Sequence, residues 1–276
     1  MTGADPGDDP GFALLTAKIS RDRGFGCASY KEKCLRRRIA VRMRARGVHT
    51  YADYARLLDH DTGEYERLLD ALTINVTKLF RNWETYDAIE RLVVPVLLRR
   101  PDPALRVWSA GCSSGEEPYS LAALFHRQAE RAGTLPALAR RLDVLGSDID
   151  RGVLETAARG VYQAAAFADT PADLRDRYFR PEAGGYGVVP EIRSLVRFDR
   201  RDLLSDPPPV GGLHLITCRN VIIYFDRATQ EALFERFHQA LAPGGFLVLG
   251  KVETLLGHTR TLFATVEPRE RIFRKQ

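Results

Sequence analysis

The sequence predicts a doubly wound α/β fold that carries a terminal antiparallel hairpin, a small β-subdomain insertion and an N-terminal all-helical domain. Three observations predict it. From residue 105 onward, short apolar segments alternate with helical patterns, which is typical of a parallel sheet with right-handed crossovers. Residues 12–70 instead show helical periodicity without strand alternation. Residues 176–200 fit neither pattern, because short β-like pieces alternate there with glycine and proline. We expect the helical domain at residues 12–76 and the α/β domain at 77–276.

Length and composition exclude several classes of protein. A chain of 276 residues that is 45% hydrophobic and 28% charged suits one large or two smaller globular domains, and excludes collagen, coiled coils and disorder. No apolar run approaches the roughly 20 residues that span a bilayer, so we expect no membrane insertion. The acidic, turn-rich amino terminus lacks the pattern of a secretory signal. The four cysteines have no CxxC spacing, which predicts reduced thiols, a cytoplasmic protein and no metal site.

A basic helix stands out in the N-terminal domain. The sixteen residues from Lys31 to Arg46 hold eight basic residues and one acidic residue, a net charge of +7 that leaves −2 for the rest of the chain. Apolar residues and arginines each recur every four positions on neighbouring faces, at Leu35, Ile39 and Met43 and at Arg38, Arg42 and Arg46. Gly47 marks the expected end of this helix, and further helices are predicted near residues 51–58 and 64–72.

The α/β domain is predicted to begin with a long helix that Asn82 caps and that Pro95 kinks or breaks. Four parallel strands are expected at residues 105–110, 142–147, 213–217 and 246–249. The first three are followed by helices near residues 118–129, 151–158 and 229–241. A hairpin of residues 262–266 and 271–274 ends the chain.

Ligands of open α/β sheets bind at the carboxyl ends of the strands, and the first such end continues as GCSSGEEP over residues 111–118. Gly111 and Gly115 allow the backbone to approach a cofactor closely. The spacing is not GxGxxG and no lysine follows, which excludes a dinucleotide site and a phosphate loop. The carboxylates of Glu116 and Glu117 would repel a pyrophosphate and favour a cation. S-adenosylmethionine therefore suits this strand end better than NAD or ATP, although a simple capped helix start remains the alternative.

The next two strand ends carry further polar side chains. Asp148 follows the second strand, where an acid accepts hydrogen bonds from both ribose hydroxyls of a nucleoside. The alternative is a helix cap at Asp148 or Asp150. The third strand is followed by Arg219 and Asn220, with Tyr224 close behind. A cation, an amide and a phenol together indicate a site rather than a core, although Tyr224 also suits a packing role.

Together these segments resemble the CheR-type chemotaxis receptor methyltransferases. The matching segments, in chain order, are 75–81 (NVTKLFR), 108–120 (WSAGCSSGEEPYS), 147–150 (SDID), 218–225 (CRNVIIYF) and 243–245 (PGG). The resemblance covers most of the chain. It implies an S-adenosylmethionine-dependent methyltransferase sheet and a protein-glutamate O-methyltransferase that forms glutamyl methyl esters in chemotaxis adaptation. Its implied substrate is the cytoplasmic helical domain of methyl-accepting chemotaxis receptors, and its implied cofactor product is S-adenosylhomocysteine.

The resemblance also implies roles for individual residues. Those implied to bind the cofactor are Asn75, Thr77, Arg81, Gly111, Glu117, Asp148, Asp202, Leu203, Arg219 and Asn220. Arg81 and Tyr224 are implied to be catalytic, by orienting the substrate carboxylate. The chain departs from the family pattern at three positions. Asp202 replaces an asparagine, Leu79 replaces a phenylalanine, and Lys251 replaces a small residue.

Methyl transfer to glutamate is an in-line displacement on sulfur-bound carbon, and it needs no general base because the carboxylate is already ionised. An acidic substrate helix would suit the arginine row Arg38, Arg42 and Arg46. A solvated helix face is one alternative for this row and RNA binding is another, although no RNA-reading fold accompanies it and we expect no nucleic-acid partner. For the whole protein, a non-catalytic cofactor-binding scaffold and an RNA methyltransferase are the alternatives. We expect a monomer.

Overall fold

The computed structural model describes residues 9–73 and 75–276. The chain divides into two compact units. The first comprises the residues up to 74 together with Tyr224–Asp226, and the second comprises Asn75–Ile223 and Arg227–Gln276. The division lies close to the expected boundary between residues 76 and 77. The sequence does not predict that the short segment Tyr224–Asp226 groups with the helical unit. Across the described residues, each helix is either too short or too polar to cross a membrane.

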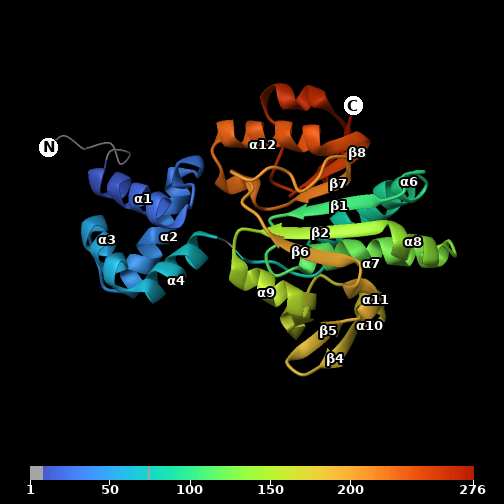
Figure 1. Cartoon of the computed structure of the whole chain (residues 1–276), viewed down its shortest axis with the longest axis horizontal. Helices are drawn as coiled ribbons and strands as arrows, with labels where there is room; N and C mark the ends of the chain where they lie inside the picture. Colours follow the sequence, from blue (N-terminus) through green and yellow to red (C-terminus); the bar gives the residue numbers. More distant parts are fainter. Residues whose placement is uncertain (1–8, 74) are drawn as a thin grey trace. The chain divides into compact units, whose positions relative to one another are not determined.

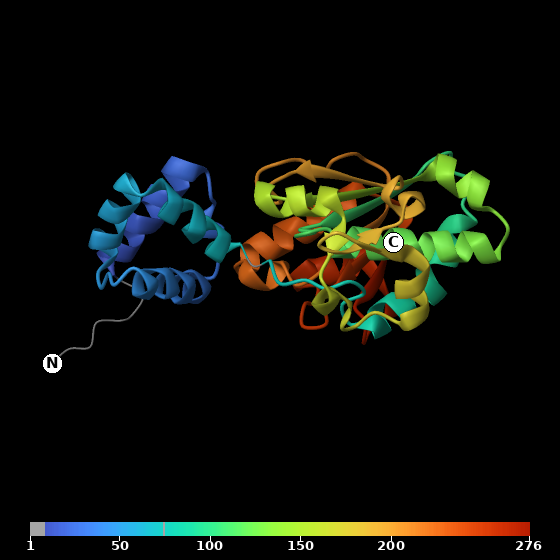
Figure 2. The same ribbon diagram turned by 90° about the horizontal axis from the view of Figure 1, so that it is seen from below.

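The first unit is built from helices, as predicted, and forms the blue part of Figures 1 and 2. Its helices are α1 Pro10–Arg23, α2 Glu32–Ala45, α3 Tyr51–His60 and α4 Thr62–Leu72. Asp9 caps α1 by accepting a hydrogen bond from Gly11 N at 2.9 Å. The core is apolar and contains the fully buried side chains of Leu15, Ile19, Ile39 and Tyr54.

The second unit contains the predicted parallel sheet with its antiparallel hairpin. Its strands are β1 Leu105–Ala110, β2 Leu142–Asp148, β6 Val196–Arg200, β7 Leu213–Cys218, β8 Leu241–Leu249, β9 Phe263–Glu267 and β10 Ile272–Lys275. Among the described residues they follow the order β6-β2-β1-β7-β8-β10-β9. The first five in this order pair in parallel, and β10 pairs antiparallel with both of its neighbours. Because β2 and β7 flank β1, the strand order reverses at β1, which is where doubly wound sheets bind ligands.

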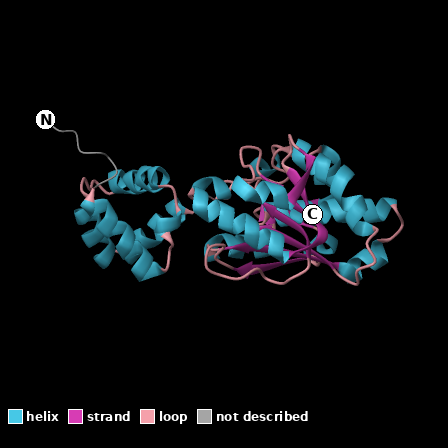
Figure 3. Ribbon diagram, turned by 90° about the horizontal axis from the view of Figure 1, so that it is seen from above, coloured by secondary structure: helices cyan, strands magenta, loops and turns pink. Residues whose placement is uncertain are grey.

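Helices cover both faces of this sheet (Figure 3). They are α5 Trp83–Ala88, α6 Val94–Leu98, α7 Glu116–Arg131, α8 Leu135–Arg141, α9 Arg151–Arg159, α10 Ala172–Tyr178, α11 Pro190–Arg193 and α12 Arg227–Ala240. On one face, Val107 of β1 shares a core with Leu121 and Phe125 of α7. On the opposite face, Trp108 meets the ring of Phe237 in α12 edge-on, with ring centres 5.6 Å apart. Successive side chains of β1 therefore point to opposite faces of the sheet and pack against different helices, as expected for a strand.

The long helix predicted after Asn82 differs in two details. Asn82 lies at φ 60° and its side chain caps nothing, so the predicted cap is wrong. Pro95 does not break the helix either. A π turn at Ile89–Val93 joins α5 to α6, and Pro95 occupies the first turn of α6, where the missing N–H leaves no hydrogen bond unmade.

The insertion predicted at residues 176–200 is wrong at both ends. A small antiparallel sheet exists, in the order β3-β5-β4, with β3 Val161–Tyr162, β4 Phe179–Glu182 and β5 Gly185–Val188. The segment β6, assigned to the insertion from the sequence, pairs with β2 in the main sheet. Its half-buried Val196 and Phe198 pack against the main core and alternate with more exposed residues, which is the pattern of an edge strand. The two-residue strand β3 is too short to be recognised by periodicity.

Candidate functional site

The predicted site residues of the second unit gather at one edge of the main sheet. The strands β6, β2, β1 and β7 run in parallel with level ends, since Asp148 is opposite Arg200, Ala110 opposite Ser147, and Ser109 opposite Thr217. The ends of these strands and the segments that follow them hold residues 202–203, 148–150, 111–117 and 219–220 respectively. The ends of β2, β1 and β7 thus lie at the same edge, as expected, and the end of β6 adds residues 202–203 to it.

The GCSSG loop after β1 is held by the end of β2. The amides of Gly111 and Cys112 both donate to the carbonyl oxygen of Ser147, at 2.8 and 2.9 Å. Gly111 lies at φ +79°, and a Cβ there would sit 2.6 Å from a methyl group of Val221. Glycine is thus required here by backbone conformation and by protein packing, a stronger reason than cofactor approach alone.

Asp148 is bound by its own loop but does not cap the following helix. Its Oδ2 accepts from Ser113 N at 2.9 Å and its Oδ1 accepts from Asp150 N at 3.1 Å. The cap of α9 is Asp150, which accepts from Gly152 N at 2.8 Å. Burial raises the pKa of Asp148. Beside it, Ser113 lies at φ 49° and its buried hydroxyl has no hydrogen-bond partner in the part of the chain that the structure describes. Ser113, whose amide binds Asp148, therefore adds a second polar group to this loop, and sequence reasoning did not single it out.

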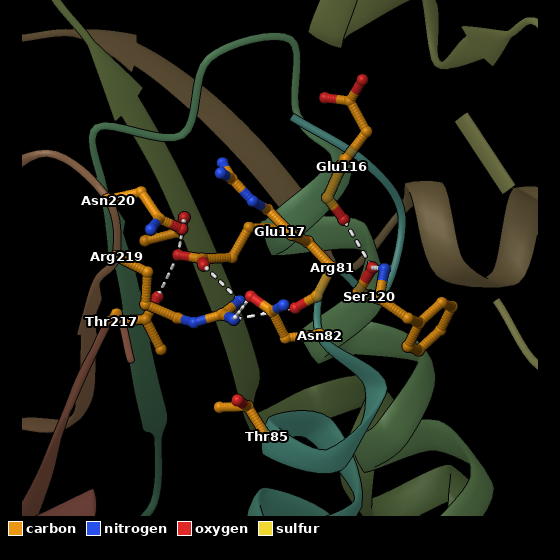
Figure 4. A network of polar contacts seen from close by, with 12 residues as sticks. Arg81, Asn82, Thr85, Glu116, Glu117, Ser120, Thr217, Arg219 and Asn220 are labelled. Carbon is orange, nitrogen blue, oxygen red and sulfur yellow. Dashed lines mark hydrogen bonds and ion pairs between the residues drawn. The ribbon is translucent and has the colours of Figure 1, made fainter. Parts of the chain in front are cut away.

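A buried network joins Glu117 of α7 to the ends of β1 and β7 (Figure 4). Oε1 of Glu117 accepts hydrogen bonds from Ser109 Oγ at 2.8 Å and from Thr217 Oγ1 at 2.5 Å. Its Oε2 lies 3.4 Å from Nη1 of Arg219, whose side chain is only 2% exposed. Nη2 of Arg219 then donates to the backbone oxygen of Arg81 at 2.8 Å. Glu117 therefore fixes Arg219, and Arg219 fixes the backbone at Arg81.

This network changes the electrostatic argument drawn from the sequence. Two free carboxylates were expected at the start of α7, but the charge of Glu117 is paired with Arg219. Glu116 is buried, accepts hydrogen bonds from Ser114 Oγ at 2.8 and 3.0 Å, and has its pKa raised by burial. The predicted pair of carboxylates is present in the first turn of α7, but both carboxylates already have partners within the protein. The carboxyl groups at this edge include those of Glu116, Glu117 and Asp148, and that of Glu117 is paired with Arg219.

The segment from Asn75 to Asn82 supplies Arg81. Asn75 Nδ2 donates to Asp150 Oδ2 at 2.8 Å, so the segment starts beside the loop of Asp148. Thr77 follows, half-buried. The Arg81 guanidinium donates to the backbone oxygen of Val76 at 2.8 Å. Leu79, one of the departures from the family pattern, is fully buried in the core.

A buried carboxylate that the sequence did not single out organises the loop after β7. Glu253 is 4% exposed and accepts from three backbone amides, those of Gly250 at 2.6 Å, Asn220 at 3.0 Å and Ile223 at 3.2 Å. Asn220 lies at φ 61°. The signal for this role was the sequence spacing of an acid shortly after a strand end, which is too common to be diagnostic. Lys251, two residues earlier, makes surface ion pairs with Glu84 and Glu270 at 3.2 and 3.5 Å.

The Asp202 side chain makes hydrogen bonds within its own turn. Its carboxylate accepts from Leu204 N at 2.8 Å and from Ser205 Oγ at 3.0 Å. Leu203 is buried, at 8% exposure. The departure from asparagine at position 202 is therefore compatible with the local fold, because the turn needs only oxygen acceptors. A role for these two residues in cofactor binding stays a prediction.

The arginine row of α2 is not a free surface. In the first unit, Arg38 is buried and donates to the carbonyl oxygen of Leu72, and Arg42 donates to Glu64 at 3.0 and 2.6 Å. Arg46 donates to Asp61 at 2.8 Å. These partners favour a structural role for the three arginines, because the face that repeats every four residues points toward α4 and its N-terminal cap Asp61. Their expected contact with an acidic substrate stays a prediction.

Tyr224 groups with the first unit. The guanidinium of Arg38 lies over its ring, 4.6 Å from the ring centre, and its carbonyl oxygen accepts from Lys31 N at 2.8 Å. Phe225 packs edge-on against Tyr30 with ring centres 5.0 Å apart. Tyr224 therefore has a packing role, and its catalytic role remains a prediction. Within the described ranges, His, Cys, Asp and Glu side chains form no cluster suited to a metal ion.

Comparisons with known proteins agree with the division of the chain into two units. The family model described as CheR methyltransferase, SAM binding domain, matches residues 75–272, and that described as CheR methyltransferase, all-alpha domain, matches residues 10–73. A chemotaxis protein methyltransferase of Listeria monocytogenes is 36% identical over 245 residues, which cover 89% of this chain and 90% of that protein. Chemotaxis protein methyltransferase 2 of Pseudomonas aeruginosa is 36% identical over 251 residues, covering 89% and 86%. A 104.1 kDa protein of Rhodobacter capsulatus is 36% identical over 273 residues, which cover 98% of this chain but only 28% of that protein. The chain belongs to the CheR methyltransferase family.

Proposed function

We propose that this protein transfers a methyl group from S-adenosylmethionine to glutamate side chains in the cytoplasmic helical domain of chemoreceptors, forming methyl esters. The observation that carries the proposal is the match of the S-adenosylmethionine-binding family model over 75–272, the same segment whose strand ends assemble Asp148, Glu117 and Arg219. The named relatives act in chemotaxis, which supports a receptor as the substrate.

The residues present fit the cofactor. Asp148 has carboxylate lone pairs beyond the two that its loop uses, which suits a ribose diol. The buried Ser113 hydroxyl lacks a partner among the described residues, and a buried hydroxyl is normally satisfied. Glu117 would attract the positive end of the donor. S-adenosylmethionine, when bound, supplies an electrophilic methyl carbon on a positively charged sulfur.

The protein's own residues then have two tasks. The substrate glutamate is ionised at neutral pH, since its reference pKa is about 4.3, so no residue has to remove a proton. The first task is to hold the carboxylate in line with the methyl carbon, and we assign it to Arg81 and Tyr224. The second is to exclude water from the carboxylate. A very tight Arg81 contact would stabilise the ground state and slow transfer, so Arg81 is expected to orient the carboxylate more than to activate it.

The outer face of α2 is a better candidate for the docking surface than the inner face, whose arginines have partners within the first unit. Lys33, Arg37 and Arg44 are exposed, share one face of the helix with half-exposed Val41, and make no ion pair in the described part of the chain. Residues 33, 37 and 44 are four and seven positions apart, so their side chains lie along one face of the helix. We propose that this outer row attracts the acidic receptor helix, with an effect that weakens as salt is added.

One assay tests the proposal. The protein is incubated with methyl-labelled S-adenosylmethionine and receptor cytoplasmic fragments, and alkali-released methanol is measured. Methyl esters release methanol in base, whereas N-methyl groups do not. A receptor fragment with its acceptor glutamates changed to glutamine is the matched control and should give no release. Label that enters RNA, or no transfer to any receptor fragment, would contradict the proposal.

A further inference from the structure

The turn that carries Arg81 is conformationally unusual. Its two neighbours, Phe80 and Asn82, lie at φ 51° and 60°. Residues other than glycine rarely adopt this left-handed region, and they persist there only when surrounding contacts hold them. The conformation of the Arg81 turn must therefore be enforced by groups outside it.

Three side chains hold the turn, each from a different part of the second unit. Ser120 Oγ of α7 accepts from Phe80 N at 2.9 Å. Nη2 of Arg219 donates to the oxygen of Arg81 at 2.8 Å, and Asp169 Oδ2 accepts from Asn82 N at 3.0 Å. The bonds to Phe80 N and Asn82 N satisfy the amides of the two left-handed residues.

Asp169 differs from the other two. Ser120 also donates to Glu116 within its own helix, and Arg219 also pairs with Glu117. Among the described residues, the hydrogen bonds of the Asp169 carboxylate go to the turn segment, to Asn82 N and, at 3.4 Å, to Lys78 Nζ. The Asn82 N–H lowers the pKa of Asp169, so the carboxylate is ionised at neutral pH. Its side chain is 29% exposed, which allows substitution without opening the core.

The neighbours of Asp169 in the chain are held in place by contacts on two sides. Ala166 O accepts from Leu79 N at 3.0 Å, and Thr170 Oγ1 donates to Leu79 O at 3.1 Å. Phe167, between these two residues, packs against Phe179 of the small sheet with ring centres 4.9 Å apart. The segment 166–170 thus runs beside the Arg81 turn and is itself fixed to the small sheet.

We propose that Asp169 is a positioning residue for methyl transfer, which acts by holding Asn82 N–H and so fixing the direction of Arg81. The proposal rests on the role proposed above for Arg81. In this role Asp169 contacts neither substrate nor cofactor. It affects methyl transfer through the backbone of the turn.

The test compares Asp169→Ala with Asp169→Asn. Asparagine keeps an oxygen acceptor for Asn82 N–H, whereas alanine removes it. We expect Asp169→Ala to lower kcat toward receptor fragments about tenfold, with a smaller change in the dissociation constant for S-adenosylhomocysteine measured by calorimetry. Asp169→Asn should recover most of the activity. Asp173→Ala, which removes a nearby surface carboxylate paired with Arg127 at 2.9 Å, is the matched control and should leave kcat unchanged.

A double-mutant cycle with Arg81→Ala separates a positioning role from general damage. If Asp169 acts through Arg81, Asp169→Ala should have little further effect once Arg81 is absent. Thermal unfolding of each variant shows whether it is folded. Wild-type kcat in Asp169→Ala, equal losses in the alanine and asparagine variants, or additive effects with Arg81→Ala would each overturn the inference. An inactive wild-type protein would instead refute the proposed function.

Discussion

Arg42→Ala is expected to destabilise the N-terminal helical unit rather than to weaken substrate binding. Arg42 donates twice to Glu64, whose side chain is 0% exposed. Removing one partner of a buried charge pair costs about 3–5 kcal/mol when nothing replaces it. Tyr54 and Arg67 still donate to Glu64 after the change, at 2.7 and 3.3 Å, and Arg42 is itself 20% exposed. We therefore expect a loss of about 2–3 kcal/mol in the free energy of unfolding.

The measurement is urea unfolding followed by circular dichroism, with amide hydrogen exchange to locate the loss in α2 and α4. Arg37→Ala is the matched control, because Arg37 lies on the same helix and is exposed. It should change the free energy of unfolding by less than about 0.5 kcal/mol. Its expected effect is instead a higher KM for receptor fragments, with the difference from wild type shrinking as salt is added.

The double variant Arg42→Ala/Glu64→Gln sharpens the test. Glutamine carries no charge that needs a counter-ion, so the double variant should be more stable than Arg42→Ala alone. The reasoning is refuted if Arg42→Ala unfolds like wild type and raises KM as much as Arg37→Ala does. That result would return the inner arginine row to the role of a docking surface.

Four further predictions concern pH, the loop after β7, the GCSSG loop and the catalytic pair. Burial opposes ionisation of Glu64, but its hydrogen bonds outweigh burial and lower its pKa below the unfolded value of about 4.5. The ionised carboxylate therefore stabilises the fold above that pH. The difference in free energy of unfolding between wild type and Glu64→Gln should become smaller as the pH falls below that value. Glu253→Gln turns an amide NH2 toward backbone donors, so we expect a loss of about 1–3 kcal/mol in unfolding free energy and a lower kcat, and unchanged values would contradict the loop's dependence on this carboxylate. Gly111→Ala should destabilise the protein by at least about 1 kcal/mol because of its positive φ and its 2.6 Å approach to a valine methyl, as thermal unfolding would show. Arg81→Ala and Tyr224→Phe should both lower kcat, with cofactor affinity closer to wild type for Tyr224→Phe; normal turnover in both, at normal calorimetric affinity, would remove them from catalysis.

The strand ends could be predicted because their signals are local. A short apolar segment followed by glycines or polar residues identifies a strand and its end together, so the sequence alone places Gly111, Asp148 and Arg219 on one edge of the sheet. The direction of each strand follows from its crossover helix. No contact between distant residues was needed for this step.

The incorrect predictions instead concern contacts between residues that are far apart in the sequence. Whether the arginine face of α2 points outward depends on Glu64, which lies 22 positions after Arg42, and periodicity shows only that a face exists. The role of Glu253 depends on Asn220, 33 positions earlier. The strand β6 was misplaced because its partner β2 is about fifty residues away in the chain. Local patterns carry no information on these pairings.

Residues 166–170 contact the small sheet on one side and the Arg81 turn on the other, which affects how the function of the small sheet can be studied. A deletion of the small sheet would remove one of these two contacts and so disturb the segment that holds the Arg81 turn, and an inactive deletion variant would therefore not show that the small sheet binds substrate. Point changes on the outer strand β4, for example at the exposed Arg180 or Glu182, leave the segment intact. With such variants, a higher KM for receptor fragments at an unchanged kcat would indicate that the small sheet takes part in substrate binding.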